Sequence, residues 1–325
     1  MIRTMSRLWL LYVALARPAF ALPHAGGPGG AMATDAHGRV YIVDTYRRVL
    51  WRVEPGGSRT ALLHDVRGTM IAVAPDGTVY LPTEDVHDTF QWRVTIVTPA
   101  GAARDTVLTT TILVDSGRTV GADTAGIYFA RGTELDQISW RGEVRTTLYR
   151  LPLGLDIAAA VPTIPRRTAV LVGNALVLSE GDSIGGDIVG DVLPGFADMG
   201  RTSARFDHPV ALAIDRVGAM YVADDGNRRL RFVTYGGTAS TLLHTTWPWR
   251  PTSVALSGDT AYVLERATGL ALPGWAAGLL GAPRVQRVTP GGKVETVVEF
   301  VSWMARMAVL VLVALAGALY VKRSG

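Results

Sequence analysis

Four side chains that could bind a metal ion lie together in one polar loop, TEDVHDT. They are Glu84, Asp85, His87 and Asp88. Carboxylates suit hard cations such as calcium, and an imidazole suits transition metals. Loops rich in charge are more often solvated connections between strands. We therefore expect a solvated loop at this position and predict no metal site there.

A second acidic cluster, Asp224-Asp225-Gly226-Asn227, resembles the start of a calcium-binding loop. The remaining ligands and the closing glutamate of that motif are missing. Asp, Gly and Asn also suit the backbone of a tight turn that holds no ion. The cluster is therefore predicted to be a hairpin turn.

The sequence offers little else for catalysis. The chain has no cysteine, which excludes disulfides, zinc–thiolate sites, iron–sulfur clusters and cysteine nucleophiles. No segment has the pattern of a nucleophile elbow, so no Ser–His–Asp triad can be assigned. His64 and His244 occupy equivalent positions in a repeat described below, where we expect strand ends and not a paired ligand. We predict no catalytic residue, no bound metal and no cofactor.

An uncharged stretch, Leu270–Leu280, carries large apolar side chains within an insertion at Glu265–Pro283. Contiguous exposed apolar surface usually marks contact with a partner or a membrane. The alternative is that the stretch folds back over the rim of the domain or plugs one end of its channel. The predicted contact residues are Leu270, Leu272, Trp275, Leu279 and Leu280.

The elements that would position these groups are short strands. Residues Phe206–His244 contain four apolar or alternating runs, separated by turns rich in Asp, Gly and Asn. This pattern is typical of antiparallel strands joined by tight turns. A sheet this small cannot bury both of its faces, so neighbouring copies must cover them. The predicted strands are Pro209–Ile214, Ala219–Ala223, Arg229–Thr234 and Ser240–Leu243.

The unit recurs along the chain. Its anchor is a small turn followed by an apolar strand, usually with a tyrosine, and successive anchors lie 39, 48, 49, 44 and 41 residues apart. A period of about 40–50 residues with four strands per unit indicates propeller blades. We predict an all-β fold, a six-bladed β-propeller with four-stranded antiparallel blades over residues 31–299. The anchors are Tyr41, Tyr80, Tyr128, Val177 (after Asn174), Tyr221 and Tyr262.

The clearest copy resembles the repeats of NHL-type β-propellers. It follows the family pattern F-x-x-P, D-x-x-G-x-x-Y-V-x-D and N-x-R in order. The first copy keeps Asp35, Gly38 and Asp44 but has Tyr46-Arg47 where the family prefers asparagine. The resemblance implies a propeller that acts mainly as a binding platform, although some relatives are enzymes. The matching residues are Phe206, Pro209, Asp215, Gly218, Tyr221, Val222, Asp224, Asn227, Arg229 and Gly237.

The N-terminal residues, 1–21, have the three-part layout of a secretory signal. Arg3 and Arg7 precede an apolar run, Leu8–Ala16, and an A-x-A cleavage pattern follows. The alternative is a retained N-terminal membrane anchor. Residues 22–30, rich in glycine, are expected to form a flexible spacer.

The C-terminal residues 300–321 are predicted to form one transmembrane α-helix. They would make about 33 Å of helix at 1.5 Å per residue, enough to cross a hydrocarbon core of about 30 Å. Aromatic residues stand near both ends, and basic residues in the tail, 322–325, place that tail in the cytoplasm. The predicted anchor residues are Trp303, Arg306, Tyr320, Lys322 and Arg323.

Composition agrees with a membrane-bound protein that does not bind nucleic acid. Charged residues make up only 18% of the 325-residue chain, and the mean hydropathy is +0.23. The net charge of +4 is spread along the sequence without a Lys/Arg block. Both ends carry their positive charge on the cytoplasmic side, which puts the propeller outside the bacterial cytoplasmic membrane, on its periplasmic side.

The sequence therefore predicts a non-catalytic, single-pass membrane protein. Its propeller would be a structural, docking subunit of an integral membrane protein complex, of the respiratory or photosynthetic type, and would lie against the lipid bilayer. Two alternatives remain open at this stage. One is a membrane-tethered propeller hydrolase or lyase with a metal in its channel, and the other is a ligand-binding sensor.

Overall fold

The computed structural model describes the larger part of the repeat region and a few residues beyond it. The described residues are 31–66, 68, 70–74, 76–84, 91–109, 117–122, 126–131, 134–141, 143–147, 157–162, 167–180, 187–191, 193–267, 282–301, 305, 307–308 and 311–312. We refer to residues 1–30 as the N-terminal segment and to residues from 302 onward as the C-terminal segment. From here on, the insertion means residues 268–281, the undescribed part of the predicted insertion.

Within these residues the chain forms six four-stranded antiparallel sheets, each built from four consecutive strands. Sheet 1 contains β1 (Met32–Thr34), β2 (Val40–Asp44), β3 (Val49–Val53) and β4 (Arg59–His64), and sheet 2 contains β5 (Ala72–Val73), β6 (Val79–Glu84), β7 (Gln91–Val97) and β8 (Ala103–Thr109). Sheet 3 contains β9 (Gly117–Ala122), β10 (Gly126–Arg131), β11 (Glu134–Ser139) and β12 (Val144–Thr147), and sheet 4 contains β13 (Ile157–Pro162), β14 (Arg167–Val172), β15 (Ala175–Glu180) and β16 (Ile188–Gly190). Sheet 5 contains β17 (Pro209–Ile214), β18 (Met220–Asp224), β19 (Arg229–Val233) and β20 (Ala239–His244), and sheet 6 contains β21 (Trp249–Ser257), β22 (Thr260–Ala267), β23 (Arg284–Val288) and β24 (Val294–Glu299).

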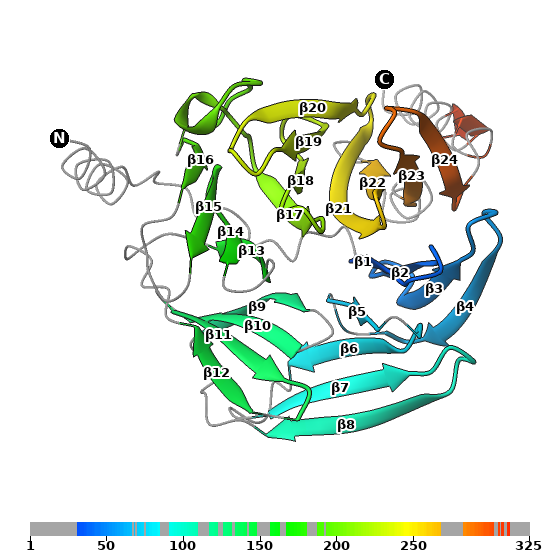
Figure 1. The fold of residues 1–325 in the computed structure, drawn as a ribbon. Coiled ribbons are helices and arrows are strands. Elements are labelled where there is room, and N and C mark those ends of the chain that lie inside the picture. Colours follow the sequence, from blue (N-terminus) through cyan, green and yellow to red (C-terminus); the bar gives the residue numbers. More distant parts are fainter. Residues whose placement is uncertain are drawn as a thin grey trace, which may run out of the picture.

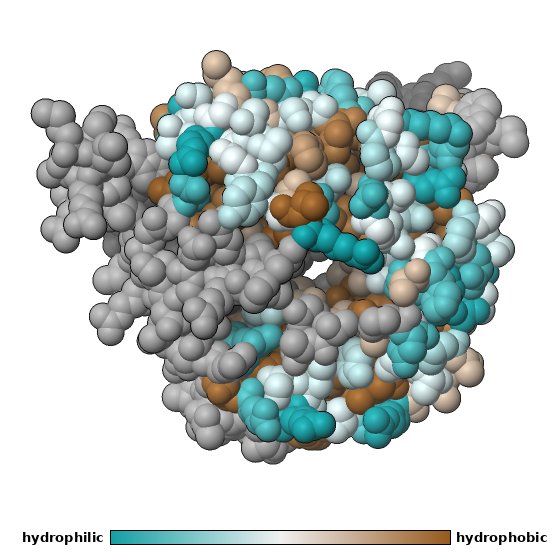
Figure 2. Space-filling model, in the orientation of Figure 1, coloured by the Kyte–Doolittle hydropathy of each residue, from teal (hydrophilic) through white to brown (hydrophobic). Residues whose placement is uncertain are grey.

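The sheets are arranged in a ring with their first strands toward the centre and their fourth strands outside (Figure 1). Strand β1 contacts β5, β9 contacts β13, β13 contacts β17, β17 contacts β21, and β21 contacts β1. Sheets 1 and 6 therefore meet, although the chain that forms them is separated by the whole length of the repeats. Figure 2 shows an opening at the centre of the ring, with hydrophobic and hydrophilic patches distributed around it. The predicted all-β, propeller-like architecture is confirmed.

The recurring Asp and Gly residues of the sequence repeat close the turns between first and second strands. In sheet 5, the Oδ1 atom of Asp215 accepts hydrogen bonds from the backbone N–H groups of Val217 and Ala219, each at 2.9 Å. Gly218 has φ of +82°, a conformation that favours glycine. Asp35 of sheet 1 makes the same two bonds, at 2.9 and 3.0 Å. The motif thus specifies the turn geometry.

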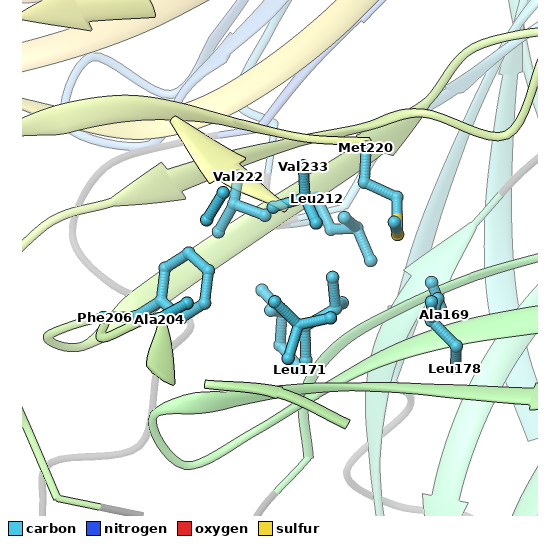
Figure 3. Close-up of a cluster of buried hydrophobic side chains, with 12 residues drawn as sticks. Ala169, Leu171, Leu178, Ala204, Phe206, Leu212, Met220, Val222 and Val233 are labelled. Atoms are coloured by element: carbon cyan, nitrogen blue, oxygen red, sulfur yellow. The ribbon is translucent and has the colours of Figure 1, made fainter. Parts of the chain in front are cut away.

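Neighbouring sheets cover each other's faces, as the repeat predicts. Figure 3 shows the cluster between sheets 4 and 5, where Leu171 and Leu178 face Leu212 and Met220. Phe206, which lies in the connection between these sheets, is completely buried in the same cluster. Because each apolar cluster of the described residues joins two neighbouring sheets, these contacts between sheets provide apolar stabilisation.

The strands predicted within Phe206–His244 are confirmed to within one residue at each end. The fourth anchor of the repeat is wrong. Asn174 lies in the turn between the second and third strands of sheet 4, and Val177 lies in its third strand. Both kinds of hairpin show an apolar run on either side of a turn residue, so periodicity alone cannot tell them apart.

Each sheet has two ends, because the chain reverses at every turn. We call the end that carries the turns between second and third strands, together with the connections from one sheet to the next, the connection face. The opposite end, with the first-to-second and third-to-fourth turns, is the turn face. Contacts between sheets join like ends. Arg39 Nη2 donates to Asp76 O at 3.4 Å on the turn face, and His208 N–H donates to Asn174 Oδ1 at 2.9 Å on the connection face.

The predicted transmembrane helix lies largely outside the described residues. Ala305, Met307, Ala308, Val311 and Leu312 have helical backbone, and the side chains of Met307, Val311 and Leu312 are exposed. Among the described residues, no helix is both long enough and apolar enough to cross a membrane.

Candidate functional site

The acidic cluster at the centre of the best repeat is a turn, as predicted. Asp225, Gly226 and Asn227 connect β18 to β19 on the connection face. Asp224 at the end of β18 is fully buried and accepts hydrogen bonds from Asp207 N–H at 2.8 Å and from Asn227 Nδ2 at 2.9 Å. These bonds use the carboxylate to fix the turn. Burial raises the pKa of Asp224 above its usual value, against the effect of these hydrogen bonds.

Two other sheets have a buried carboxylate at the same position. Asp44, Asp224 and Glu265 each follow the strand tyrosine by three residues, and each forms the last pair of its second strand with the third. All three are 0% exposed. A buried charge is costly unless it is paired, so the partners of these acids indicate what the position does.

Asp44 joins sheet 1 to sheet 6. Its Oδ1 atom accepts backbone N–H bonds from Tyr46 and Arg47 at 3.1 Å each, and its Oδ2 atom accepts from Arg47 Nη1 at 2.9 Å. Arg266, at the end of β22, donates from Nη2 to Asp44 Oδ1 at 3.3 Å. Burial lowers the pKa of Arg266, while Asp44 opposes that shift. This ion pair therefore contributes directly to closing the ring.

Glu265 holds the second and third strands of sheet 6 together. Its Oε2 atom accepts a hydrogen bond from Arg284 Nε at 2.5 Å, and Arg284 lies over the ring of the buried Trp249 with 4.2 Å to its centroid. Glu265 Oε1 is buried without a hydrogen-bond partner. Burial raises the pKa of Glu265, although Arg284 opposes that shift. Burial therefore dominates over the ion pair at this carboxylate.

Arg231 of β19 ties sheet 5 to the connection that precedes it. This side chain is 0% exposed. Its Nη1 atom donates to Asp224 Oδ2 at 3.0 Å and to Arg205 O at 2.8 Å, and its Nη2 atom donates to Asp198 Oδ1 and Ala197 O at 2.7 Å each. The guanidinium group thus fastens a segment that lies outside the regular repeat.

A further pair joins sheets 5 and 6. Arg250, near the start of β21, donates from Nη1 to both Asp225 Oδ2 and Asp225 O at 3.2 Å. Burial raises the pKa of Asp225, and Arg250 opposes that shift. The connection face of sheets 5, 6 and 1 is therefore crossed by a series of arginine–carboxylate contacts.

The boundaries with three of the undescribed parts of the chain lie around this network. Ala31 O, next to the N-terminal segment, accepts a hydrogen bond at 2.9 Å from the N–H of Val43, beside the buried aspartate of sheet 1. Arg266, the partner of that aspartate, lies two residues before the insertion. Phe300 N–H, next to the C-terminal segment, donates at 3.1 Å to the oxygen of Pro283, just after the insertion. All three segments thus leave the described structure near the junction of sheets 1 and 6.

These arginines and carboxylates act on one another and on the fold. Their hydrogen bonds are directed to turns and to neighbouring sheets, which is how a rigid scaffold uses buried charge. The described residues contain no group of three or more His, Asp or Glu side chains placed to hold a metal ion. Sequence reasoning identified Asp224 but missed its arginine partners. The available signal was the acid three residues after the tyrosine in three repeats, each with an arginine in or beside the following strand.

Several predicted site residues can now be placed. His64 and His244 are exposed last residues of β4 and β20, so the prediction that they mark strand ends is confirmed. Glu84 ends β6, and its side chain lies outside the described atoms, as do Asp85, His87 and Asp88. The predicted contact residues and membrane anchor residues also lie outside the described part of the chain. The predicted contact residues are Leu270, Leu272, Trp275, Leu279 and Leu280. The predicted membrane anchor residues are Trp303, Arg306, Tyr320, Lys322 and Arg323.

Comparison with known proteins shows similarity of fold. No protein-family model matches this sequence, and no curated protein matches it. A structural genomics protein of unknown function from Bacteroides thetaiotaomicron matches 72% of this chain and 66% of its own length, with a TM-score of 0.58 and 15% identity. An auxiliary nutrient binding protein from the same organism matches 73% of this chain and 66% of its own length, with a TM-score of 0.54 and 14% identity. A streptogramin B lyase matches 85% of this chain and 84% of its own length, with a TM-score of 0.51 and 14% identity.

These similarities support a β-propeller fold and nothing more specific. This chain spans about two thirds of the first two structures, 66% of each. The names of the matched proteins cover binding and catalysis, which agrees with the general rule that one fold serves several functions. Function must therefore be argued from the residues of this chain.

Proposed function

We propose that this protein is a membrane-anchored, non-catalytic β-propeller that serves as a docking subunit of a larger membrane protein complex. In this proposal the six sheets are six blades of an NHL-type ring. One observation carries the proposal: directly after the last sheet, helical residues expose the apolar side chains of Met307, Val311 and Leu312. They belong to an apolar stretch long enough to span a bilayer, and a membrane would cover such side chains.

The ion pairs support a scaffold in place of an enzyme. Asp44, Asp224 and Glu265 are fully buried and bonded to arginine, so they are committed to holding sheets and turns together. A rigid ring of this kind presents a fixed surface to a partner, which lowers the entropy lost on binding.

The orientation follows from the charges at the two ends of the sequence. Arg3 and Arg7 precede the first apolar run, and Lys322 and Arg323 follow the last one. Basic residues remain on the cytoplasmic side. The propeller would then lie on the periplasmic side of the cytoplasmic membrane, as an extracytoplasmic domain of a single-pass protein.

Membrane fractionation followed by blue-native electrophoresis tests the proposal. We expect the full chain to stay with the membrane after an alkaline carbonate wash and to migrate within a larger assembly. Replacing Leu270, Leu272, Trp275, Leu279 and Leu280 with serine should release it from that assembly. The matched control replaces two exposed valines of the turn face, Val217 and Val294, with serine and should leave the assembly intact.

Three results would contradict the proposal. Extraction of the full chain from the membrane by carbonate would contradict the proposed membrane anchor. Migration only as a free monomer, unaffected by the serine substitutions, would contradict the proposed docking role. Stoichiometric calcium, zinc or manganese in the purified protein would favour a propeller hydrolase or lyase instead.

A further inference from the structure

The three apolar segments of this chain leave the propeller from one side. Within each sheet, the start of the first strand, the end of the second and the end of the fourth lie at the same end of the meander. The N-terminal segment precedes a first strand, the insertion follows a second strand, and the C-terminal segment follows a fourth strand. The chain contacts around Asp44 and Arg266 bring these three boundaries to the connection face at the junction of sheets 1 and 6.

Two large aromatic side chains are exposed on that same face. Trp247, 64% exposed, lies in the connection that leads into the first strand of sheet 6. Tyr46, 56% exposed, lies in the turn between the second and third strands of sheet 1. The connection that carries Trp247 runs from sheet 5 to sheet 6, and sheet 1 is the next neighbour of sheet 6, so both aromatics lie on the connection face of this arc. Tryptophan and tyrosine have an apolar ring with a polar tip, which suits them to the boundary between lipid and water.

At the junction, two buried acids pair with arginines that are less buried. Asp44 is fully buried while its partner Arg47 keeps 30% of its side chain exposed, and Glu265 is fully buried while Arg284 keeps 15% exposed. Arg48, on the same turn as Tyr46, has 48% of its side chain exposed and pairs with Asp65, which is 65% exposed. Arg47 and Arg48 therefore place guanidinium groups at the surface, and such groups bind phosphate well.

The turn face carries charge of both signs. It exposes Asp76, and its Glu295, whose hydrogen bonds from Arg287 and then Lys293 lower its pKa to about 2, is paired with Lys293, which is 73% exposed. Charge alone therefore does not separate the two faces, and the boundaries of the three segments decide between them.

We propose that the connection face at the junction of sheets 1 and 6 lies against the lipid bilayer, with Trp247 and Tyr46 in the interface and with Arg47 and Arg48 facing lipid phosphate groups. This inference rests on the proposed membrane anchoring and adds the side that faces the lipid. The turn face is then directed away from the membrane.

Site-directed quenching tests this orientation. The chain has no cysteine, so one introduced cysteine gives one labelling site. The full chain would carry an environment-sensitive fluorophore at Trp247→Cys or Tyr46→Cys on the connection face. The matched controls are Val217→Cys and Tyr235→Cys, which are similarly exposed positions on the turn face of sheet 5. Each variant would be reconstituted in vesicles of equal parts phosphatidylcholine and phosphatidylglycerol, and thermal unfolding would verify that it is folded.

We expect lipids with a quencher at the headgroup boundary to quench the connection-face labels several-fold more than the turn-face labels. Aqueous iodide should show the opposite order. Equal quenching at both faces, or stronger lipid quenching of the turn face, would overturn the inference and leave the anchoring intact. Labels on the connection face that are shielded from both quenchers would indicate a protein contact and would also overturn it. Failure of the chain to insert into vesicles would contradict the proposed function itself.

Discussion

Sheets 5, 6 and 1 and sheets 2, 3 and 4 share one architecture but differ at one position of the second strand. In the first arc, the position three residues after the strand tyrosine is a buried acid, Asp224, Glu265 or Asp44. In sheets 2 and 3 the same position holds Thr83 and Arg131, and the last pair of sheet 4 uses Val172. The first arc therefore combines apolar packing between sheets with buried ion pairs. Sheets 2, 3 and 4 have a threonine, an arginine and a valine at that position.

The contrast between the two arcs indicates where side-chain contacts must hold the ring closed. Sheets 1 and 6 come from opposite ends of the repeats, and each is completed by its own consecutive strands, so no shared strand joins them. Closure depends on side chains, including the Asp44–Arg266 pair and the cluster that contains Met32, Ile42 and Tyr262. Buried pairs also fix register, because a misplaced charge is costly in an apolar interior.

Removing Arg231 should produce the largest effect. Replacing Arg231 with methionine leaves the buried Asp224 without its cation and releases Asp198, and we expect the free energy of unfolding to fall by about 3–5 kcal/mol. Urea unfolding of the full chain in detergent would measure this loss. The exposed Arg216→Met serves as the control and should change stability by less than about 0.5 kcal/mol. Equal losses of stability from the two substitutions would show that the buried ion pairs of Arg231 contribute no more than an exposed arginine does.

Asp44→Asn should weaken ring closure. The substitution removes the charge that pairs with Arg47 and Arg266, and hydrogen bonds to charged groups contribute about 1.5–3 kcal/mol. Chemical unfolding should show a loss of that size, and Thr83→Ala at the equivalent position of sheet 2 should cost less than about 1 kcal/mol. A larger loss from Thr83→Ala than from Asp44→Asn would show that the two arcs are fastened alike.

On the turn face, Gly218→Ala should cost about 1–2 kcal/mol because the backbone is left-handed there. The new Cβ atom would also lie 2.9 Å from Tyr235 Cδ2. Gly236→Ala is the matched control, because its Cβ atom would come no closer than 3.9 Å to another residue. Thermal unfolding should separate the two variants. If neither substitution changes the unfolding temperature, the motif does not require glycine at position 218.

The pH dependence of stability should carry a smaller signature of Glu265. Its folded pKa is raised by burial, so the folded state favours the protonated form. The stabilising contribution of Glu265 to the unfolding free energy is fully present below the pKa of glutamate in the unfolded chain, about 4.3. It is lost as the pH rises through the raised pKa of Glu265 in the folded state. The difference in unfolding free energy between wild type and Glu265→Gln should therefore shift against the wild type over that interval. A difference that stays constant with pH would show that the pKa of Glu265 is not raised.

The sequence could predict the repeating elements because local patterns determine them. The Asp215 and Gly218 turn, the four strands of sheet 5 and the strand-end histidines follow from periodicity and turn chemistry, and the structure confirms them. The anchor predicted at Asn174 in sheet 4 is wrong, because one hairpin resembles the next when no tyrosine marks the second strand.

The pairing partners could not be predicted in the same way. Arg266 and Asp44 are 222 residues apart in sequence, and only closure of the ring brings them together. Arg231 pairs with Asp198 and donates a hydrogen bond to Ala197 O, in a connection without a repeat pattern. Long-range side-chain pairs depend on the arrangement of whole sheets, which a single sequence encodes only through apolar packing. The same reason prevents the sequence alone from assigning the face that bears the chain's apolar segments.

Native-state hydrogen exchange tests the central claim most directly, namely that buried ion pairs make sheets 5, 6 and 1 the part of the ring that is most stable against local unfolding. Amides of the second strands would be compared, β2, β18 and β22 against β6, β10 and β14. We predict that the first group exchanges only through global unfolding and that the second exchanges faster, through partial opening. Exchange of β6, β10 and β14 as slow as or slower than that of β2, β18 and β22 would contradict the account.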